Sequence, residues 1–585
     1  MGVNGWANAY YSAAVMSGAE DWTAFFYGSS DPGNAITVDK PPLSIWVMAL
    51  SARLFGLNSW SILLPQAFMG VLTAFLLYIS VRKRFGAAAG LLAATLMAVT
   101  PVSTVMFRYN NPDALLVLIM VGIALSVLKA IDAKRPVWLI LAGVLVGAGF
   151  LTKQLQICLV IPALVATYLA FAQEAWLRRL LHLTLAGLAA MGIGGSWLLA
   201  VQLTDPSSRP FIGGSRGNSS LELALGYNGL GRLTGEDATR TLSGSAARLA
   251  ENPEPGITRF LQPQFSGQFG WFIPFAVAGL ILTVVYICTR RGATSKNALL
   301  LFSSVWLVSA CGVVAYMSGI LHPYYSLTAV PPLSILAAIT ILYLAHRSNI
   351  LRFRLALAFT FASSLLLAFI TASRSVQEFP GLPLLIACTG GIILALQVLP
   401  PPNITMRKIS VGFLLAAILI VPLLWSVNTV INPHVGAGVI AGPSIFGIRS
   451  DHPNRVDWPV DLPPGVAVLV YGDEAPPGIV EQLEDAPESL TWPAATVGAQ
   501  TAANLQLASQ RSVLPIGGWD GTDPYPTLSV FQQWVAEGRV GALLIGNLPT
   551  LTQEGQGESA KIVKWVRETH RADRVDGMES YDLTQ

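Results

Sequence analysis

Long apolar stretches separated by short polar loops fill the chain from about residue 60 to about residue 428. Each is long enough to cross the hydrocarbon core of a bilayer as a helix, which takes about 20 residues. They lie near residues 60–81, 87–106, 112–131, 136–152, 154–172, 180–203, 270–289, 297–319, 323–344, 352–372, 380–398 and 408–427. The pattern predicts a polytopic α-helical membrane bundle of about twelve spans.

The loops between these spans alternate in their content of Lys and Arg. The basic loops carry Arg82-Lys83-Arg84, Lys134-Arg135, Arg178-Arg179, Arg290-Arg291 with Lys296, Arg347 with Arg352 and Arg354, and Arg407-Lys408. The alternate short loops carry only Arg108, Lys153 and Arg374. Because Lys and Arg accumulate on the cytoplasmic side, the basic loops are predicted to face the cytoplasm. Segment 1–59, loop 204–269 and tail 429–585 are then placed outside.

The opening segment 1–59 is predicted to be an outer loop. Its apolar run 43–57 is too short to span and has both ends outside, so we expect a helix lying at the membrane surface. Met1 is also placed outside, with no signal peptide or helix before it. Either an upstream span precedes this segment, which would raise the count to thirteen, or the start is misassigned.

The tail 429–585 changes to a mixed pattern that predicts a small α/β domain. Residues 466–474, 512–521 and 540–548 have the character of strands that end in turns. Residues 501–510, 527–538 and 559–570 have helical periodicity. This alternation favours a largely parallel sheet. The glycines of "GGWDG" at 517–521 do not match a nucleotide-binding fingerprint, so we interpret this stretch as a turn.

Composition supports the membrane assignment and excludes other classes. Of the 585 residues only 12% are charged, about half the share of a soluble protein. The net charge of +3 is too small to indicate a nucleic-acid partner, and no basic, aromatic-interleaved patch indicates one, so none is predicted. The four cysteines lie in apolar runs and the six histidines have no paired spacing, so neither a disulfide framework nor a metal site is predicted. A divalent cation held by single carboxylates stays possible.

Asp39 and Lys40 stand side by side before Pro41-Pro42, at the start of the apolar run 43–57. Prolines at a helix start fix φ and make the preceding turn rigid. A lysine held there can neutralise a phosphate, and a carboxylate there can take a proton from a hydroxyl. Taken alone, the pair also fits an interfacial lysine with a local acid partner.

Further polar residues gather at the same predicted face of the membrane. They are Arg108, Asn110, Asn111 and Asp113 in one loop, Lys153 and Gln154 in a second, and His322, Tyr324 and Tyr325 in a third. Each group alone is typical of a helix cap or an aromatic belt. Ionisable groups at membrane depth are costly, however, and indicate function. A convergent set of cations and carboxylates suits an anionic, membrane-borne ligand such as a lipid phosphate.

Motifs along nearly the whole chain carry a family resemblance. They are "NGWANAYYSAAV", "GSSDPGNAITVDKPP", "SWSILLPQ", "RYNNPDALL", "GFLTKQLQ", "NSSLELALGYNGLGRLTG", "HPYY", "ATVGAQTAANLQLAS" and "GGWDGTDPYPTL". The chain resembles the bacterial glycosyltransferase family 39, which includes relatives of protein O-mannosyltransferases and of the aminoarabinose transferase of lipid A. Within it, the resemblance is closest to the mannosyltransferase-like branch with an extra C-terminal domain.

The resemblance implies a GT-C fold in the bacterial plasma membrane, with the active site and the C-terminal domain outside. It implies a donor sugar on a polyprenyl phosphate and an acceptor that is a glycolipid, a cell-wall polymer or a protein. The stereochemistry of transfer stays open. Lys40 matches the lysine expected to contact the donor phosphate. The same comparison with the family's motifs makes Arg108, Lys153 and His322 candidates for contacts to the phosphate or the leaving group.

One departure concerns the catalytic base. Many relatives carry an acidic pair in the first outer loop, where this chain has Asn8 and Tyr11 and no carboxylate. If the reaction needs a base, Asp39 is the first candidate, and Asp113, Asp21 and Asp31 are weaker ones. Expected substrate contacts are Asn8, Tyr11, Asn110, Asn111, Gln154, Tyr227, Asn228, Tyr324 and Tyr325, with Arg232 in the same outer loop as Tyr227.

Two other classes of function remain alternatives. A lipid or solute transporter would be expected to show paired repeats and charges near the bilayer midplane, whereas the polar groups here gather at one end of the spans. A catalytically silent homologue whose tail binds a ligand is the second alternative, and the missing loop acid favours it.

Overall fold

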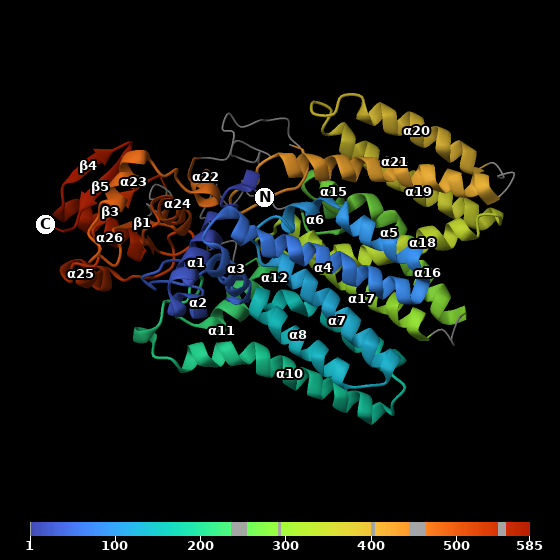
Figure 1. The fold of residues 1–585 in the computed structure, drawn as a ribbon, viewed down its shortest axis with the longest axis horizontal. Coiled ribbons are helices and arrows are strands. Elements are labelled where there is room, and N and C mark those ends of the chain that lie inside the picture. The colour runs from blue at the N-terminus through green and yellow to red at the C-terminus, as the bar shows by residue number, and fades with distance from the viewer. Residues whose placement is uncertain are drawn as a thin grey trace.

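The computed structural model describes residues 2–235, 254–289, 294–398, 404–443, 464–547 and 557–584. The chain forms a long helical bundle at one end and a small α/β domain at the other (Figure 1). The N-terminal helices α1 (Ala9–Glu20), α2 (Trp22–Tyr27) and α3 (Leu43–Phe55) lie between these two parts. The predicted basic pair Arg290-Arg291 and the strand end at 548 lie outside the described residues.

The bundle makes this a multi-pass membrane protein. Among the described residues, nine helical stretches are long and apolar enough to cross a membrane. The bundle helices are α4 (Ser59–Phe85), α5 (Ala87–Ala98), α6 (Pro101–Met106), α7 (Asp113–Ala133), α8 (Val137–Lys153), α9 (Ile161–Phe171), α10 (Trp176–Leu203), α15 (Pro263–Phe269), α16 (Ile273–Thr289), α17 (Thr294–Tyr316), α18 (Val330–His346), α19 (Leu351–Ser373), α20 (Leu382–Val398) and α21 (Ile404–Ile431). Helix α18 is buried along most of its length, whereas α10 exposes much of its apolar surface, as expected where lipid replaces water.

Four of the twelve predicted spans differ from a simple crossing helix. The span predicted over 87–106 breaks at Thr100-Pro101 into α5 and α6, because a proline cannot continue the hydrogen-bond ladder of the preceding helix. The span over 380–398 is the 17-residue α20. The spans over 136–152 and 154–172 form one continuous helical stretch in sequence, Val137–Phe171, but this stretch reverses at Gln154. Tyr168 and Ala172 consequently line the same small cavity as Pro136, which precedes α8.

One end of the bundle is held by a shared carboxylate. Asp132, near the end of α7, accepts a hydrogen bond from Lys83 Nζ at 2.8 Å and forms an ion pair with Arg84 at 2.8 Å. It also accepts a hydrogen bond from Ser295 Oγ, at the start of α17, at 2.8 Å. Loops that were predicted to share one side of the membrane therefore do meet at one end of the bundle.

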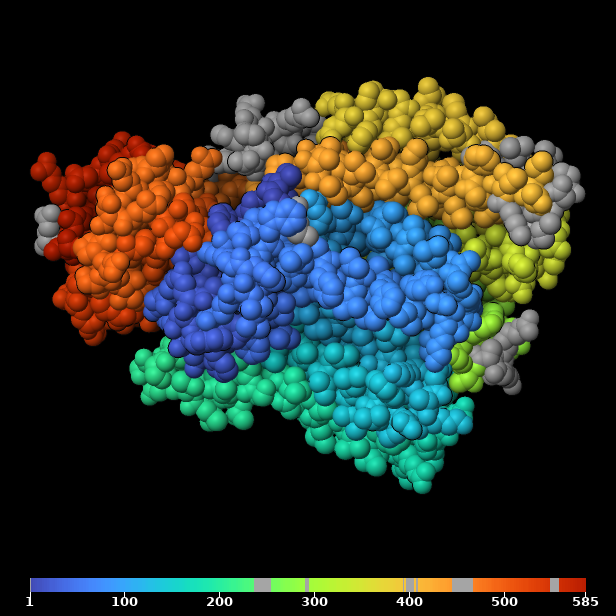
Figure 2. Space-filling view, in the orientation of Figure 1, coloured from blue at the N-terminus to red at the C-terminus, as the bar shows by residue number. Residues whose placement is uncertain are grey.

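The N-terminal segment contains the short helix expected over 43–57. This helix, α3, has 13 residues, about 20 Å of axial rise, which is too short to cross a bilayer. It buries Ile45, Met48 and Ala49 and exposes Leu54 and Phe55. In the space-filling view the N-terminal segment is packed directly against the C-terminal domain (Figure 2).

The C-terminal domain is built on a five-stranded sheet of order β2-β1-β3-β5-β4. Strands β1 (Ala494–Val497), β2 (Val513–Ile516) and β3 (Ala542–Ile545) are parallel. Strands β4 (Ala572–Val575) and β5 (Met578–Asp582) form an antiparallel pair added at the β3 edge. Its helices are α22 (Pro464–Tyr471), α23 (Pro477–Glu484), α24 (Ala499–Ser509), α25 (Leu528–Ala536) and α26 (Glu558–Thr569). The predicted α/β domain is confirmed, with a mixed sheet in place of a largely parallel one.

One predicted strand is wrong. The run 466–474 forms most of helix α22 and the turn that follows it. Gly472, at a φ of 75°, donates its N–H to Val468 O at 2.8 Å and ends the helix. A short continuous apolar run fits a strand and a helix equally well, and here the packing of α22 on α24 accompanies a helix.

Candidate functional site

The Asp39-Lys40 turn is fixed on both sides by the fold. Its N-terminal neighbour Ile36 pairs with Phe211, a bridge that joins the turn to the loop after α10. On its other side Pro41-Pro42 lead into α3. The Asp39 N–H donates to the hydroxyl of Tyr10, on α1, at 3.0 Å. The turn is therefore held as rigidly as the proline pair predicts.

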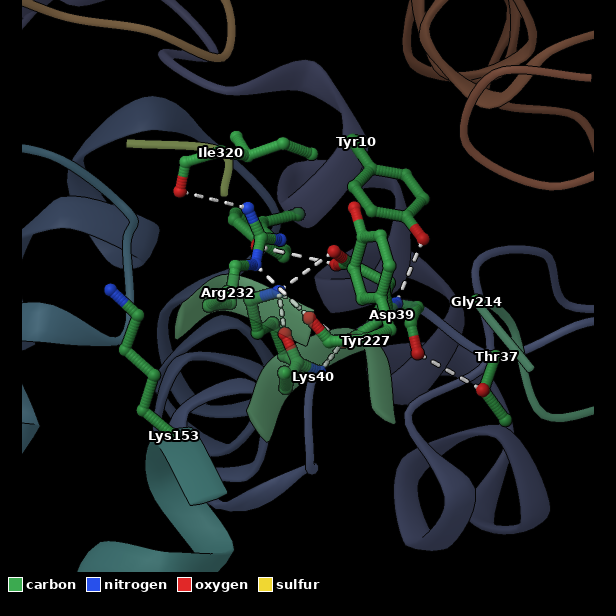
Figure 3. Close-up of polar contacts among 12 residues, drawn as sticks. Tyr10, Thr37, Asp39, Lys40, Lys153, Gly214, Tyr227, Arg232 and Ile320 are labelled. Atoms are coloured by element: carbon green, nitrogen blue, oxygen red, sulfur yellow. Dashed lines mark hydrogen bonds and ion pairs between the residues drawn. The ribbon is translucent and has the colours of Figure 1, made fainter. Parts of the chain in front are cut away.

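Lys40 lies at the centre of a polar cluster that Figure 3 shows in close-up. Its ammonium donates to Asp39 Oδ2 at 2.8 Å and to Asn228 Oδ1 at 2.6 Å. The Asn228 amide in turn donates to Asp39 O at 2.6 Å. Burial lowers the pKa of Lys40 to about 8, although the neighbouring Asp39 carboxylate opposes this shift. Lys40 is thus mostly protonated at neutral pH.

Loop 204–235 supplies a second cation to the cluster. It contains a π-helical turn, Gly226–Leu230, that carries Tyr227 and Asn228. The Arg232 guanidinium lies 4.6 Å from the centre of the Tyr227 ring, and Lys40 Nζ lies 5.3 Å from the same centre. Arg232 also donates to Ile320 O at 3.3 Å, beside His322 in the chain. Tyr227 is therefore flanked by two cations from distant segments.

A second ion pair is formed by Lys153, the last residue of α8, and Asp113, the first residue of α7. Lys153 Nζ lies 2.5 Å from Asp113 Oδ2, and both side chains are almost fully buried. The ammonium also lies 4.5 Å from the centre of the Tyr325 ring and 5.3 Å from that of Tyr324. Asn111 supplies a side-chain hydrogen bond to Tyr324. Each of these residues was predicted from the sequence, and they lie together.

His322 connects the two ion pairs. Its ring stacks on Tyr324 with centroids 4.9 Å apart. Burial, and then the positive charges of Arg232, Lys153 and Lys40, lower the pKa of His322 well below its usual range. The imidazole is therefore neutral at physiological pH. The Tyr324 ring that stacks on His322 lies 5.3 Å from Lys153 Nζ, and Arg232 donates to Ile320 O, two residues before His322. Lys40 and Arg232 both lie against the Tyr227 ring, so the three cations and His322 occupy one neighbourhood.

Several buried polar atoms of this neighbourhood have no partner among the described residues. They are Asp113 Oδ1, His322 Nδ1 and both amide atoms of Gln154. Gln154 is also held at a φ of 46°, which a residue with a side chain rarely adopts. Buried polar atoms in folded proteins almost always have a partner. Unpaired atoms beside a cluster of cations therefore indicate a place for a polar ligand.

Two of the predicted residues, Asn8 and Asn110, join segments of the protein. Asn110 Oδ1 accepts from the Asn8 N–H at 2.9 Å, and Asn110 Nδ2 donates to Asn8 O at 2.9 Å. This exchange fixes the start of α1 to the loop before α7. Tyr11, also on α1, points its hydroxyl at Asp39 Oδ1, 3.5 Å away.

Arg108 does not join the cluster. Its guanidinium donates to Thr429 O and Val430 O, each at 3.2 Å. These are carbonyls of the last turn of α21, which have no partner within the helix. The predicted phosphate contact of Arg108 is replaced by a cap on a helix end that is distant in the sequence.

The sequence reasoning missed the residues that the C-terminal domain brings to this site. Trp519, Asp520 and Asp523 belong to the stretch "GGWDGTDPYP", which was interpreted as a turn. The Trp519 ring lies edge-on to that of Tyr10 with centroids 5.1 Å apart. The sequence feature that could have pointed to these residues is the presence of two acids and an aromatic residue within one glycine-rich turn. Nowhere in the described ranges do three His, Cys, Asp or Glu side chains gather as a metal site would require.

Two family models match the chain. Residues 39–197 match the family described as "Dolichyl-phosphate-mannose-protein mannosyltransferase". Residues 479–569 match the family described as "Putative mannosyltransferase YkcB-like, C-terminal". The first match covers the Asp39-Lys40 turn and the Lys153–Asp113 pair, and the second covers most of the α/β domain.

Similar proteins extend these matches to the whole length. The chain is 28% identical to "Putative mannosyltransferase YycA" of Bacillus subtilis, over 98% of this chain and 92% of the relative. It is 28% identical to "Undecaprenyl phosphate-alpha-4-amino-4-deoxy-L-arabinose arabinosyl transferase 2" of Proteus mirabilis, over 29% of this chain and 31% of the relative. Among solved structures, ArnT from Cupriavidus metallidurans bound to undecaprenyl phosphate has a similar fold, with a TM-score of 0.50 and 15% identity over 98% of this chain and 93% of ArnT.

Proposed function

Since the chain belongs to the GT-C glycosyltransferases of family 39, we propose that it moves a sugar from a polyprenyl-phosphate carrier to an acceptor outside the cytoplasm. The acceptor is a glycolipid, a cell-wall polymer or a protein. The solved ArnT structure bound to undecaprenyl phosphate and the name of the Proteus mirabilis relative support a lipid-phosphate donor. A transporter has no comparable support.

The cationic cluster carries this proposal. The basic side chains of Lys40, Lys153 and Arg232 act together on one buried neighbourhood, in which the pKa of His322 lies well below its usual range. When the bond between the sugar and the carrier breaks, the leaving phosphate gains negative charge. Cations already held in place stabilise that gain without rearranging during the reaction. Lys40, Lys153 and Arg232 are therefore proposed to hold the phosphate, with the neutral His322 donating a hydrogen bond.

Neutral partners in the cluster are proposed to hold the substrates. The unpaired amide of Gln154 can bond to the phosphate or to a sugar hydroxyl. Tyr227, Tyr324 and Tyr325 surround the ammonium groups and offer ring faces of the kind that sugars pack against. Asn228 holds the position of Lys40. Asn111 holds that of Tyr324.

The two acids suggested as bases are engaged in this structure. Asp39 Oδ2 is paired with Lys40, and Asp113 Oδ2 is paired with Lys153. We propose that both carboxylates fix the ammonium groups in the site before the donor binds.

We assign the side of the membrane on which the cationic cluster lies from the distribution of Lys and Arg among the loops. Loops rich in Lys and Arg lie at the end of the bundle marked by Asp132, and the cationic cluster lies where α7 begins and α8 ends. By the preference of basic loops for the cytoplasm, we place the cluster and the C-terminal domain outside. The lipid-linked sugar is then bound from the outer leaflet.

The proposal is tested by reconstituting the purified protein in lipid vesicles with radiolabelled polyprenyl-phosphate sugars and an envelope extract. Release of polyprenyl phosphate is measured, because this product forms whichever acceptor is used. Lys40→Ala should reduce the release rate about 100-fold, the scale of losing one group that stabilises transition-state charge.

Lys129→Ala is the matched control, since Lys129 is exposed near the other end of α7 and contacts the Trp138 ring. It should retain the wild-type rate. Unchanged turnover in Lys40→Ala, or no release by the wild type from any sugar tested, would contradict the proposed function.

A further inference from the structure

A loop of the C-terminal domain, residues 517–526, packs against the Asp39-Lys40 turn. Trp519 of this loop contacts Tyr10, whose hydroxyl accepts a hydrogen bond from the Asp39 N–H. Tyr525 of the same loop stacks on Phe211, with centroids 5.0 Å apart and planes inclined by 9°. Phe211 in turn pairs with Ile36, just before the turn. The loop is thus fixed at two points to the segments that build the site.

Gly214 lies between the loop 517–526 and Asp39. The Gly214 N–H donates to Asp523 Oδ2 at 2.8 Å. On its other side, a Cβ at Gly214 would lie 3.5 Å from Asp39 Cβ and 3.5 Å from the Tyr227 ring. A single residue without a side chain therefore separates Asp523 from Asp39 and Tyr227. Asp523 anchors the loop at this position.

Asp520 is the second acid of this loop. Its Oδ1 accepts hydrogen bonds from the Thr522 N–H at 3.1 Å and the Thr522 hydroxyl at 2.6 Å. Its side chain keeps part of its surface exposed. The charge of Asp520 raises the pKa of Tyr227, and that of Asp39 raises the pKa of Asp520. Asp520 directly follows Trp519, whose ring contacts Tyr10, so it belongs to the part of the loop that is packed on α1 beside the Asp39-Lys40 turn.

The site thus has two unlike sides. Lys40, Lys153 and Arg232 lie on the side of the proposed phosphate, together with the unpaired and buried His322 Nδ1. Asp520 and Asp523 both come from the C-terminal domain, in the loop that contacts Tyr10 and Gly214.

We propose that Asp520, supplied by the C-terminal domain, is the base that receives the proton of the acceptor hydroxyl during sugar transfer. This rests on the proposed function. The acceptor O–H bond breaks and its proton passes to the Asp520 carboxylate, while the acceptor oxygen bonds to the anomeric carbon. The bond between that carbon and the phosphate oxygen breaks, and its electron pair leaves with the carrier.

The protonation of Asp520 suits this role. Burial raises the pKa of Asp520 to about 6, with bonds from Thr522 opposing the shift. The titratable groups that face Asp520 are Asp39, Asp523 and Tyr227, and the first two add negative charge. A base works best when its pKa lies near the working pH. Asp39 and Asp113 are each paired with a lysine in this structure.

The experiment compares Asp520→Asn with the wild type in the vesicle assay, from pH 5 to pH 8. Polyprenyl phosphate release should fall about 100-fold or more, the usual contribution of a general base. The decline of the wild-type rate below about pH 6 should disappear. Binding of radiolabelled undecaprenyl phosphate should stay within about twofold, because the phosphate side is untouched.

Two further variants complete the test. Asp520→Glu keeps a carboxyl group and should retain more turnover than Asp520→Asn. Asp573→Asn changes an exposed acid of the same domain and should behave as the wild type. Equal loss in the Asn and Glu variants, loss of carrier binding in Asp520→Asn, or an unchanged rate and pH profile would overturn the role of Asp520. A wild type that releases no polyprenyl phosphate would instead contradict the proposed function itself.

Discussion

At the scale of single residues, the site is built from buried charges that are neutralised in pairs. The Lys153–Asp113 pair is the more enclosed of the two, with exposed side-chain fractions of 6% and 0%. The Lys40–Asp39 pair retains about a tenth of each side chain exposed, at 10% and 10%. A buried pair contributes little net stability, but removal of one partner leaves an uncompensated charge. Changing one residue of the enclosed pair should therefore destabilise the protein more than changing both residues together.

Lys153→Met should lower the free energy of unfolding by about 3–5 kcal/mol, because Asp113 would be left ionised without a counter-charge. The double variant Lys153→Met/Asp113→Asn removes both charges and should recover much of the loss. Sugar transfer should stay low in both the single and the double variant, because both lack the ammonium group that is proposed to hold the phosphate. Thermal unfolding in detergent and polyprenyl phosphate release measure the two effects. Equal stability of the single and double variants would contradict the coupling.

The types of residue along the sequence predicted most of the candidate site. Which of these residues meet in space depends on packing between segments that are distant in the sequence. Lys40, Lys153 and His322 were recognised by charge at the ends of apolar runs, and they do meet. Arg108 satisfied the same criterion, yet it caps α21, more than 300 residues along the chain. Asp520 was passed over as a turn residue because nothing near it in sequence shows that α1 and Gly214 pack against its loop.

At the scale of elements, the position of Lys153 depends on how α8 packs against α10. Two glycines one turn apart on α8, Gly143 and Gly147, let the helices approach closely. A Cβ on Gly147 would lie 2.6 Å from Ala190 O, and one on Gly143 would collide with Ala186 O. Small residues at this spacing are typical of tightly packed membrane helices. Because α8 ends at Lys153, a displaced α8 would also displace the ammonium group.

Gly143→Ala should therefore destabilise the protein and lower transfer, although alanine is the better helix former by about 1 kcal/mol. Gly187→Ala on α10 is the control, since a Cβ there has nothing within 4 Å. The control should be neutral or slightly stabilising in thermal unfolding in detergent. A Gly143→Ala protein as stable and as active as the Gly187→Ala protein would show that α8 and α10 can separate without cost.

The elements that the sequence predicted well are those with a strong periodic signal. Helices α25 and α26 have an apolar and a polar face, and both were predicted as helices. Strand β1 has no such alternation, because all four of its residues are buried. Strand β1 was not predicted from the sequence, and the run that forms α22 was wrongly predicted to be a strand. Thr100-Pro101 divides an apolar run whose hydropathy alone suggested one continuous span.

At the scale of the whole molecule, the C-terminal domain is docked on the N-terminal segment through buried polar contacts. The Trp492 ring N–H donates to Asp31 Oδ1 at 2.8 Å. The Gln506 amide donates to Ala13 O and to Ser30 O, each at 3.2 Å. The bundle and the α/β domain were both predicted from the sequence, but this contact was not. It joins residues more than 450 positions apart, which no local pattern encodes.

The docking contact should weaken as pH rises, because burial raises the pKa of Asp31 to about 6 despite its hydrogen bonds from Trp492 and from backbone N–H groups. Its unfolded pKa is about 3.9. The folded state therefore binds the proton more tightly, and this contribution is present below about pH 4 and lost by about pH 6, a fall of about 3 kcal/mol. Asp31→Asn cannot titrate, so the unfolding temperature of the wild type should fall relative to that of the variant between pH 4 and pH 6, and then run parallel to it. Asp573→Asn, an exposed change, should follow the wild type throughout. A wild-type curve parallel to that of Asp31→Asn over the whole range would mean that Asp31 is already ionised at pH 4 and that its hydrogen bonds outweigh its burial.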